Sequence, residues 1–413
     1  MEIRKLEGKE RYDAYLLFNY CFHQRVELQE SDVEKYSSAT DEDWGAFDDD
    51  NHLMARIINN HYDFYFDGKT VKAGGIGGVA TLPEYRNTGA VREIFNALIP
   101  EAYKNGEVIS TLYPFNHEFY RKFGYEVVTF QNEYSFTPAT LTNYRKVVSA
   151  DSAFTIRKWN TGDSVSDFLS VYNQFAPAYN FAAVRNEEMM LNKLKYDKPF
   201  IDRKFSYLIL ENGKPVSYII FTDIRNDPAA ILQVNECAWT SRESFYAILG
   251  FLGQFSADYG TIKLPLPNGI DLLRFIKTPD AYSIEKRVCQ HFMVRVMNAR
   301  KILEIIKKPA NCDFTMKLTD EMIADNNAVF RVLADRVEVL DAEPAGTTAS
   351  TNTGKTTGRK FDIELNVRAL GQLASGCLNI NEAALRNDVT INSNEEMLKS
   401  VFTEKNILVT ESF

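Results

Sequence analysis

Gly74–Phe95 reads GGIGGVATLPEYRNTGAVREIF. The first part of this stretch is rich in small and β-branched residues and stops at Pro83, which is typical of a strand and its end. The second part carries apolar residues at helical spacing. These are Ala90, Val91, Ile94, Phe95, Leu98 and Ile99. The stretch therefore predicts a strand, a short polar loop and the N-terminus of a helix, in that order.

The polar loop at residues 86–89 lies where a phosphate group would bind well. The first backbone N–H groups of a helix have no partner within the helix, and they lie at the positive end of its dipole. A diphosphate suits such a position. Gly89 allows a close approach because it has no Cβ, and Arg86 adds a permanent positive charge. The same pattern also fits a glycine-rich strand followed by an ordinary surface helix, so both interpretations stay open at this point.

The loop resembles the cofactor loop of the GNAT acetyltransferases, Gln/Arg-x-x-Gly-x-Gly/Ala. Arg86 and Gly89 match it, and Val91 departs from it in the last place. In that family the preceding strand pairs with the pantetheine arm of acetyl-CoA, so the resemblance implies acetyl-CoA as co-substrate. Asn87 and Thr88 stand where family loops often carry arginines, which implies a lower affinity. The residues expected to hold acetyl-CoA are Val79, Ala80, Thr81, Arg86, Asn87, Thr88, Gly89, Ala90, Val91, Arg92 and Asn116.

A second motif lies in residues 116–125, after a predicted strand at residues 107–112. Asn116 can cap a short helix, and Gly124 can end it with a positive φ. Tyr120, Gly124 and Tyr125 match the Y-x-x-x-G-[FY] motif of many GNAT enzymes. That resemblance implies that Tyr120 is the general acid, which protonates the departing thiolate. The alternative is an aromatic residue of the core.

Composition limits the class of protein. With 413 residues, of which 45% are hydrophobic, the chain is too long for one ordinary core, and two or three domains are expected. No apolar run approaches the roughly 20 residues that span a bilayer, and the polar N-terminus is no signal peptide. The five dispersed cysteines predict a reduced, cytoplasmic protein without a metal site. The net charge of −9 argues against nucleic acid and suits cationic small molecules.

The order of predicted elements divides the chain into three parts. Residues 1–150 contain both motifs and form the N-terminal GNAT domain with the acetyl-CoA site. Residues 151–290 repeat its order of strand, hairpin, strand, helix and strand, but they lack the Arg-x-x-Gly loop, so we expect a degenerate second GNAT domain. Residues 291–413 differ in character and form a third domain with a functional C-terminal tail.

Over its whole length the chain resembles the Eis (enhanced intracellular survival) family of N-acetyltransferases. The resemblance implies an α+β protein of two tandem GNAT folds, each with a mixed central sheet and flanking helices, followed by an α+β domain like a sterol carrier protein. It also implies a homohexamer and a general base at the C-terminal carboxylate of Phe413. It is carried by WGAFDDD at 44–50, GGVATLPEYRNTGAVR at 77–92, FYRKFGYE at 119–126, VRALGQLASG at 367–376 and Phe413.

The expected activity is the acetyl-CoA-dependent N-acetylation of a primary amine on a small cationic acceptor that resembles an aminoglycoside, a polyamine or lysine. The amine must lose a proton before it attacks, and a carboxylate can take that proton. Because transfer is direct within a ternary complex, no enzyme nucleophile is needed. The alternative is a non-catalytic binding protein whose sterol-carrier-like domain holds an apolar ligand.

Overall fold

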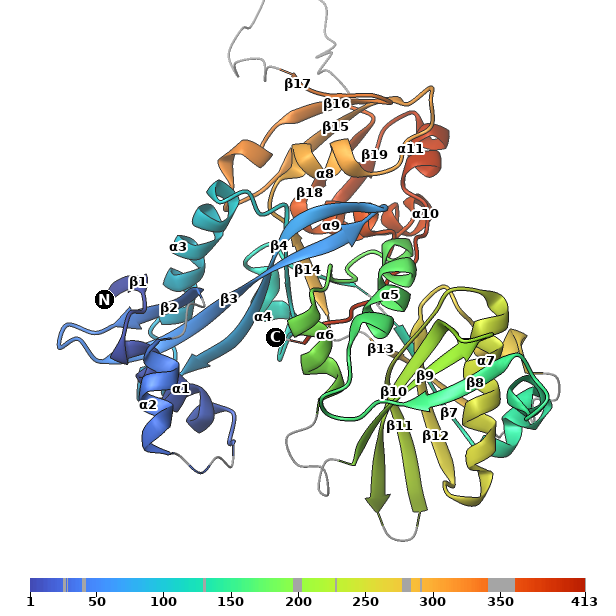
Figure 1. Ribbon diagram of the computed structural model, residues 1–413. Helices are drawn as coiled ribbons and strands as arrows, with labels where there is room; N and C mark the ends of the chain where they lie inside the picture. Colours follow the sequence, from blue (N-terminus) through green and yellow to red (C-terminus); the bar gives the residue numbers. More distant parts are fainter. Residues whose placement is uncertain are drawn as a thin grey trace, which may run out of the picture.

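The protein folds around three β-sheets whose faces are covered by helices (Figure 1). The structure is a computed structural model. It describes the chain apart from residues 25, 26, 28, 39–41, 129–130, 196–202, 227–228, 277–283, 290–291, 341–360 and 413, and at 226 and 229 it describes the backbone only. The predicted α+β class, with two GNAT-like mixed sheets and a separate third sheet, is confirmed.

The first sheet is ordered β1-β2-β3-β4-β5-β14-β6, and β4 and β5 run parallel in it. The apolar side of α3 packs against β2, β3 and β4, as the helical spacing of its apolar residues predicts. The elements are β1 (Glu2–Lys5), α1 (Lys9–Cys21), α2 (Glu30–Ser37), β2 (Glu42–Phe47), β3 (Leu53–Phe66), β4 (Lys69–Thr81), α3 (Ala90–Lys104), β5 (Ile109–Leu112), α4 (His117–Arg121), β6 (Glu126–Val127) and β14 (Met293–Val296).

The second sheet repeats this plan in the order β13-β7-β12-β11-β10-β9-β8, with β11 and β12 as its parallel pair. One helix, α7, connects the parallel strands, just as α3 does in the first sheet. The elements are β7 (Gln131–Phe136), β8 (Phe154–Lys158), α5 (Ser166–Phe175), α6 (Glu187–Leu194), β9 (Lys204–Glu211), β10 (Lys214–Asn226), β11 (Ala229–Trp239), α7 (Arg242–Gly253), β12 (Thr261–Pro267) and β13 (Ile284–Cys289).

The two large sheets exchange one strand each. β7 follows β6 in the chain but lies between β12 and β13 of the second sheet, while β14 follows β13 but lies between β5 and β6 of the first. The two crossing segments are joined where the N–H of Val128 donates to the carbonyl oxygen of Phe292 at 2.9 Å. Sheet membership therefore changes between β6 and β7, before the domain boundary expected at 150, and between β13 and β14, where the sequence places the boundary at 290.

The third sheet lies at one end of the molecule, in the order β17-β16-β15-β18-β19 (Figure 1). Its core is continuous with the core beneath one part of the first sheet, because one cluster of buried side chains contains both Phe64 of β3 and Phe314 of β15. The elements are α8 (Ala299–Ile305), β15 (Asp313–Thr319), β16 (Val329–Leu333), β17 (Val337–Leu340), β18 (Ile363–Asn366), α9 (Val367–Ser375), α10 (Ile380–Ala383), β19 (Val389–Ile391) and α11 (Glu395–Val401).

A buried ion pair joins the first and third sheets beside Gly124. Arg295 of β14 is fully buried, and its guanidinium donates to both carboxylate oxygens of Asp320 at 2.8 Å and to the carbonyl oxygen of Phe123 at 2.8 Å. Gly124 has a φ of +80°, and a Cβ at this position would overlap the guanidinium of Arg295. The glycine predicted from the motif is thus required both by the backbone conformation and by the arginine packed against it.

The first prediction concerns Gly124→Ala. The added methyl group imposes a strained left-handed residue and displaces Arg295, so we expect the free energy of unfolding to fall by about 3 kcal/mol or more. Gly213→Ala is the matched control, because Gly213 has a φ of +81° but nothing within 4 Å of a Cβ. Urea unfolding followed by circular dichroism measures both variants. Equal losses in the two would contradict the role of Arg295.

Candidate functional site

The parallel strands β4 and β5 separate part-way along their length. They pair over Ala73–Ile76 and Ile109–Leu112, and β4 then continues to Thr81 without a β5 partner. A β-bulge begins the separation, since Ile58 pairs with Gly77 whereas Arg56 pairs with Ala80, and Gly78 has a φ of +54°. Backbone groups of β4 beyond Ile76 are therefore available on the side that β5 leaves, which creates a slot for an extended amide-containing chain.

A tight loop follows the open end of β4. It contains a short 3₁₀ turn at Pro83–Tyr85, and the Thr88 hydroxyl donates to the carbonyl oxygen of Tyr85 at 2.7 Å. The phenol of Tyr85 in turn donates to Asp48 at 2.6 Å, at the tip of the hairpin between β2 and β3. This bond, together with the His52 backbone N–H, lowers the pKa of Asp48 to about 2. The loop is thus fixed by its own bonds and by the neighbouring hairpin.

Gly89 ends the loop and is the N-cap of α3. Its φ is +88°, and no atom lies within 4 Å of the place where a Cβ would stand. No side chain caps this helix N-terminus. Its first N–H groups, from Ala90 to Arg92, therefore have no side-chain cap and lie at the positive end of the helix dipole, next to the open space at Gly89. Arg86, Asn87, Thr88 and Arg92 have exposed side chains around this space.

Tyr120 lies on α4, which follows the end of β5. Its side chain is 2% exposed and packs edge-to-face against Phe95 of α3 and Phe115. Among the described residues its hydroxyl has no hydrogen-bond partner, whereas that of Tyr125 is paired with Ser110 at 2.7 Å. Burial raises the pKa of Tyr120, so the phenol stays protonated through the neutral range. Asn116 caps α4, as predicted, by accepting from the N–H of Phe119 at 3.0 Å.

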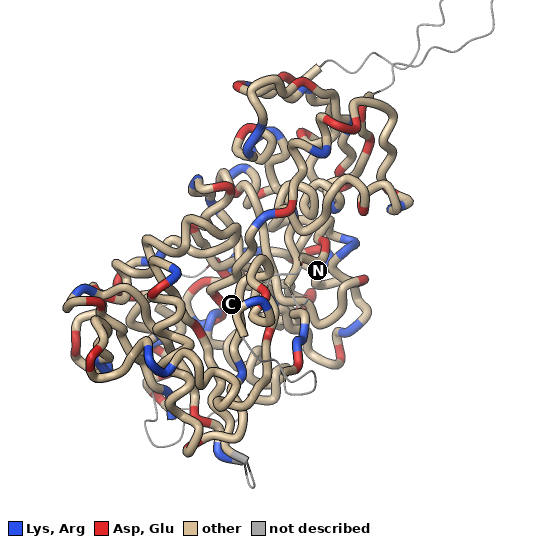
Figure 2. The backbone as a smooth tube through the Cα atoms, turned by 90° about the vertical axis from the view of Figure 1, so that its right-hand side faces the viewer, with Lys and Arg blue, Asp and Glu red and all other residues tan. Residues whose placement is uncertain are grey.

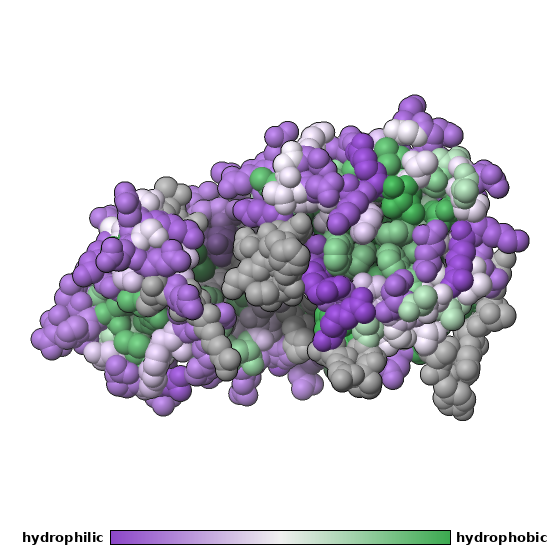
Figure 3. All heavy atoms as spheres, turned by 60° about the horizontal axis from the view of Figure 1, so that its bottom comes forward, coloured by the Kyte–Doolittle hydropathy of each residue, from purple (hydrophilic) through white to green (hydrophobic). Residues whose placement is uncertain are grey.

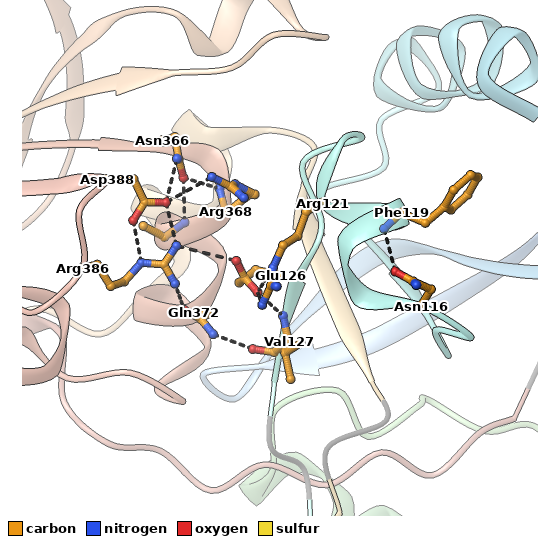
Figure 4. A network of polar contacts seen from close by, with 11 residues as sticks. Asn116, Phe119, Arg121, Glu126, Val127, Asn366, Arg368, Gln372, Arg386 and Asp388 are labelled. Atoms are coloured by element: carbon orange, nitrogen blue, oxygen red, sulfur yellow. Dashed lines mark hydrogen bonds and ion pairs between the residues drawn. The ribbon is translucent and has the colours of Figure 1, made fainter. Parts of the chain in front are cut away.

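A network of ion pairs and hydrogen bonds fixes α4 and β6 against the third domain (Figure 4). Glu126 accepts from Arg121 at 2.7 Å and lies 3.6 Å from Arg386, which follows α10. Burial alone would raise the pKa of Glu126, but Arg121 lowers it below its usual value. Gln372 of α9 donates to the carbonyl oxygen of Val127 at 2.6 Å. The third domain therefore helps to hold the helix that carries Tyr120.

The C-terminal segment reaches the end of β5, near α4 (Figure 1). The phenol of Tyr113, directly after β5, donates to the backbone carbonyl oxygen of Glu411 at 2.6 Å. Phe413, the predicted general base, lies outside the described residues. Sequence reasoning missed the Tyr113–Glu411 contact, because the two residues are 298 positions apart and no local pattern links them.

Sequence reasoning missed a polar cluster in the first sheet. It lies where β4 and β5 are still paired. His61 of β3 is 3.2 Å from both Glu42 and Glu107, and Asn59 donates to Glu107 at 2.8 Å. The two carboxylates, Glu107 first, raise the pKa of His61 to about 10. Gly74, where β4 and β5 are still paired, lies beside this cluster. The cluster therefore stabilises the closed part of the sheet and does not belong to the slot. Within the described ranges no group of three His, Cys, Asp or Glu residues could hold a metal ion.

Positions of Lys and Arg and positions of Asp and Glu are intermixed along the described backbone (Figure 2). The face toward the bottom of Figure 1 is largely hydrophilic with apolar patches, and it is hollowed near its middle (Figure 3). In the described part of the chain, none of the helices has the length and apolar character needed to traverse a bilayer.

Comparison with family models identifies two of the three parts. Residues 2–128 match the acetyltransferase (GNAT) domain, and residues 293–408 match the sterol carrier protein domain. The first match shows that the N-terminal part of the chain is a GNAT acetyltransferase domain. The second match begins with β14, the strand that lies in the first sheet. A search of curated proteins gave no match.

Solved structures share the fold over the whole chain. A probable N-acyltransferase of unknown function from Enterococcus faecalis is 18% identical, with a TM-score of 0.80 and 98% of each chain covered. A GCN5-related N-acetyltransferase from Anabaena variabilis is 18% identical, with a TM-score of 0.81 and coverage of 98% of this chain and 99% of that one. Eis1 from Mycobacterium abscessus is 16% identical, with a TM-score of 0.77 and 100% of both chains covered. The chain thus has the three-part fold of Eis1, as its sequence predicts.

Proposed function

We propose that the protein is an acetyl-CoA-dependent N-acetyltransferase that acts on the primary amine of a small cationic acceptor. The observation that carries this proposal is the slot between β4 and β5, which opens beside an uncapped helix N-terminus at Gly89. An acyl-CoA has a diphosphate joined to an amide-containing arm, and the two features lie in the order that such a ligand requires. Acetyl-CoA would supply the activated acyl group.

In this proposal each predicted cofactor residue would contribute to binding acetyl-CoA. Backbone groups of Val79, Ala80 and Thr81 would pair with the pantetheine arm, because β5 has turned away from them. The N–H groups of Ala90, Val91 and Arg92 would bind the diphosphate. The exposed side chains of Arg86, Asn87 and Thr88 would lie around it. The side-chain oxygen of Asn116 already caps α4, which leaves its amide group for the ligand.

Two groups of this chain would move protons. Tyr120 holds a proton on a buried hydroxyl without a partner among the described residues, and it would donate that proton to the departing thiolate. The carboxylate of Phe413 would accept the proton of the acceptor amine. Its support is the position of Glu411, which is bonded to Tyr113 at the end of β5. Direct transfer needs no enzyme nucleophile.

The acceptor class and the assembly rest on the resemblance to the Eis family. The net charge of −9 suits a cationic acceptor. A homohexamer and a cytoplasmic location stay predictions. The alternative is a non-catalytic binding protein that uses the sterol-carrier-like domain. A thermal-shift titration with acetyl-CoA distinguishes it from the proposal. Saturating acetyl-CoA should raise the melting temperature of an acetyltransferase, and the absence of a shift would favour the alternative.

The second prediction tests the diphosphate site with Gly89→Val. The added side chain fills the open space at the helix N-terminus, so we expect acetyl-CoA affinity to fall by at least about tenfold, which is 1.4 kcal/mol. Gly106→Val is the matched control, because Gly106 has a φ of +87° and equally open space at the other end of α3. Isothermal titration calorimetry measures both. Unchanged affinity in Gly89→Val would refute the site.

The third prediction concerns Tyr120→Phe, which keeps the ring and removes the proton. General acids typically contribute about 10²–10⁴-fold, so kcat should fall within roughly that range while acetyl-CoA binding is kept. Tyr207→Phe, which removes another phenol whose pKa burial raises, should leave kcat unchanged. A near-normal rate in Tyr120→Phe would return this residue to a purely structural role.

The fourth prediction concerns the carboxylate of Phe413. Three residues appended after Phe413 move the carboxylate away, so turnover should fall by about 10²-fold or more, as expected for a lost general base, while acetyl-CoA still binds. The same three residues placed before Met1 serve as the control. Full activity of the C-terminally extended chain would leave the base to a side chain such as His117 or Glu118.

A further inference from the structure

The second sheet has a slot in the same place as the first. β11 and β12 pair over Ile231–Gln233 and Thr261–Lys263 and then separate. A bulge again begins the separation, because Phe221 pairs with Val234 and Ile220 with Glu236, which leaves Asn235 unmatched. In both sheets the bulge lies on the longer parallel strand, just after its last paired residues. The backbone architecture that opens the acyl-CoA slot is therefore present twice.

The second slot has no place for a diphosphate. Only Thr240 and Ser241 connect β11 to α7, whereas residues 82–89 connect β4 to α3. The start of α7 is closed by its own side chains, since the Ser241 hydroxyl accepts from the N–H of Ser244 at 3.1 Å. The Ser244 hydroxyl in turn accepts from the N–H of Ser241 at 3.0 Å. The N-terminus that is open in α3 is thus capped in α7.

The C-terminal segment crosses this second slot. Leu408, Val409 and Thr410 line a cavity of about 210 Å³ together with Glu236 and Cys237 of β11 and with residues of β12. Asn268, directly after β12, accepts from the N–H of Ile407 at 2.8 Å. On the other side, the N–H of Leu408 donates to the carbonyl oxygen of Asn180 at 3.1 Å. The backbone N–H groups of the segment are therefore bonded on both flanks, to the side-chain oxygen of Asn268 on one and to the carbonyl oxygen of Asn180 on the other.

A buried ionic network fixes the end of the segment. Arg185 is 4% exposed, donates to both carboxylate oxygens of Glu236 at 2.6 Å, and donates to Glu411 at 2.7 Å. Lys193 lies 3.2 Å from the second oxygen of Glu411. Burial alone would raise the pKa of Glu236, but Arg185 lowers it to about 2. Both carboxylates therefore share one cation, so the acidic residue of the tail completes a site built in the second domain.

We infer that the second GNAT-like domain is a receptor for the chain's own C-terminal segment. Its slot binds this extended, mainly apolar segment, which Glu411 anchors, where the first sheet keeps a slot open for acyl-CoA. Arg185 and Glu236 are then positioning residues. They hold Glu411, whose carbonyl oxygen is bonded to Tyr113 at the end of β5, and so direct the last residues toward the first slot. The docking stands on the contacts alone, and only its consequence for catalysis rests on the proposed function.

The thiol of Cys237 gives a readout of docking that does not depend on activity. Cys237 is 8% exposed and lines the cavity beside the segment. In a chain that ends at Lys405, Cys237 should react with a maleimide at least about tenfold faster, because no local opening has to precede the reaction. Cys312, buried in the third domain, reports general loosening in the same sample, and mass spectrometry quantifies both thiols. Equal acceleration at both thiols, or none at Cys237, would overturn the inference.

A point variant of the full chain tests the positioning role. Glu411→Gln removes the charge through which Arg185 binds the segment, so Cys237 labelling should rise and kcat should fall about tenfold or more while acetyl-CoA affinity stays the same. Asp223→Asn is the matched control, since Asp223 is a buried carboxylate of β10, paired with Arg203 and Arg225. It should change none of the three measurements. If the variants label faster but the unmodified chain itself shows no acetylation, the receptor role stands and the proposed function is refuted instead.

Discussion

The rest of the structure depends on the reciprocal exchange of β7 and β14. Each strand completes the sheet of the other half, where it forms antiparallel ladders on both of its sides. Neither large sheet can close without the other, because a missing central strand would expose unpaired N–H and C=O groups on two neighbours. The exchange therefore fixes how the two slots lie relative to each other. It also brings Arg295 of β14 to Asp320 and so ties the third domain to the same frame.

The two sheets joined by β7 and β14 hold the candidate site in a fixed geometry, although few side chains form it. The slot between β4 and β5 consists mainly of backbone groups, and the helix N-terminus at Gly89 presents N–H groups. The side chains of the loop therefore need to make few contacts with a bound ligand. Tyr120 is placed by α4, whose position is in turn fixed by Glu126 and the cations around it. The third domain thus contributes to the site through packing and charge, without itself providing a residue of the slot.

The local features of the site could be predicted from the sequence. The strand-loop-helix order around Gly89, the Asn116 cap and the positive φ of Gly124 each follow from a few neighbouring residues. The strand exchange could not be predicted, because β7 and β14 read as ordinary strands whichever sheet they join. Nor could the pairing of Arg185 with Glu411, which spans 226 positions and connects two residues that alone look like surface charges.

In both large sheets a bulge on the longer parallel strand opens a slot, and we propose a different ligand for each slot. Where the parallel strands of this chain separate, the backbone groups of the longer strand lose their partners on the neighbouring strand. In the first sheet the long loop before α3 keeps an open helix N-terminus beside the slot. In the second sheet the connection before α7 is short, the helix N-terminus is capped by Ser241, and a segment of the same chain lies over the cavity beside β11 and β12. The proposal thus gives the second domain a role although it lacks the Arg-x-x-Gly loop. Where the first slot would bind a diffusible ligand, the second would bind a tethered segment, whose effective concentration is set by the chain itself.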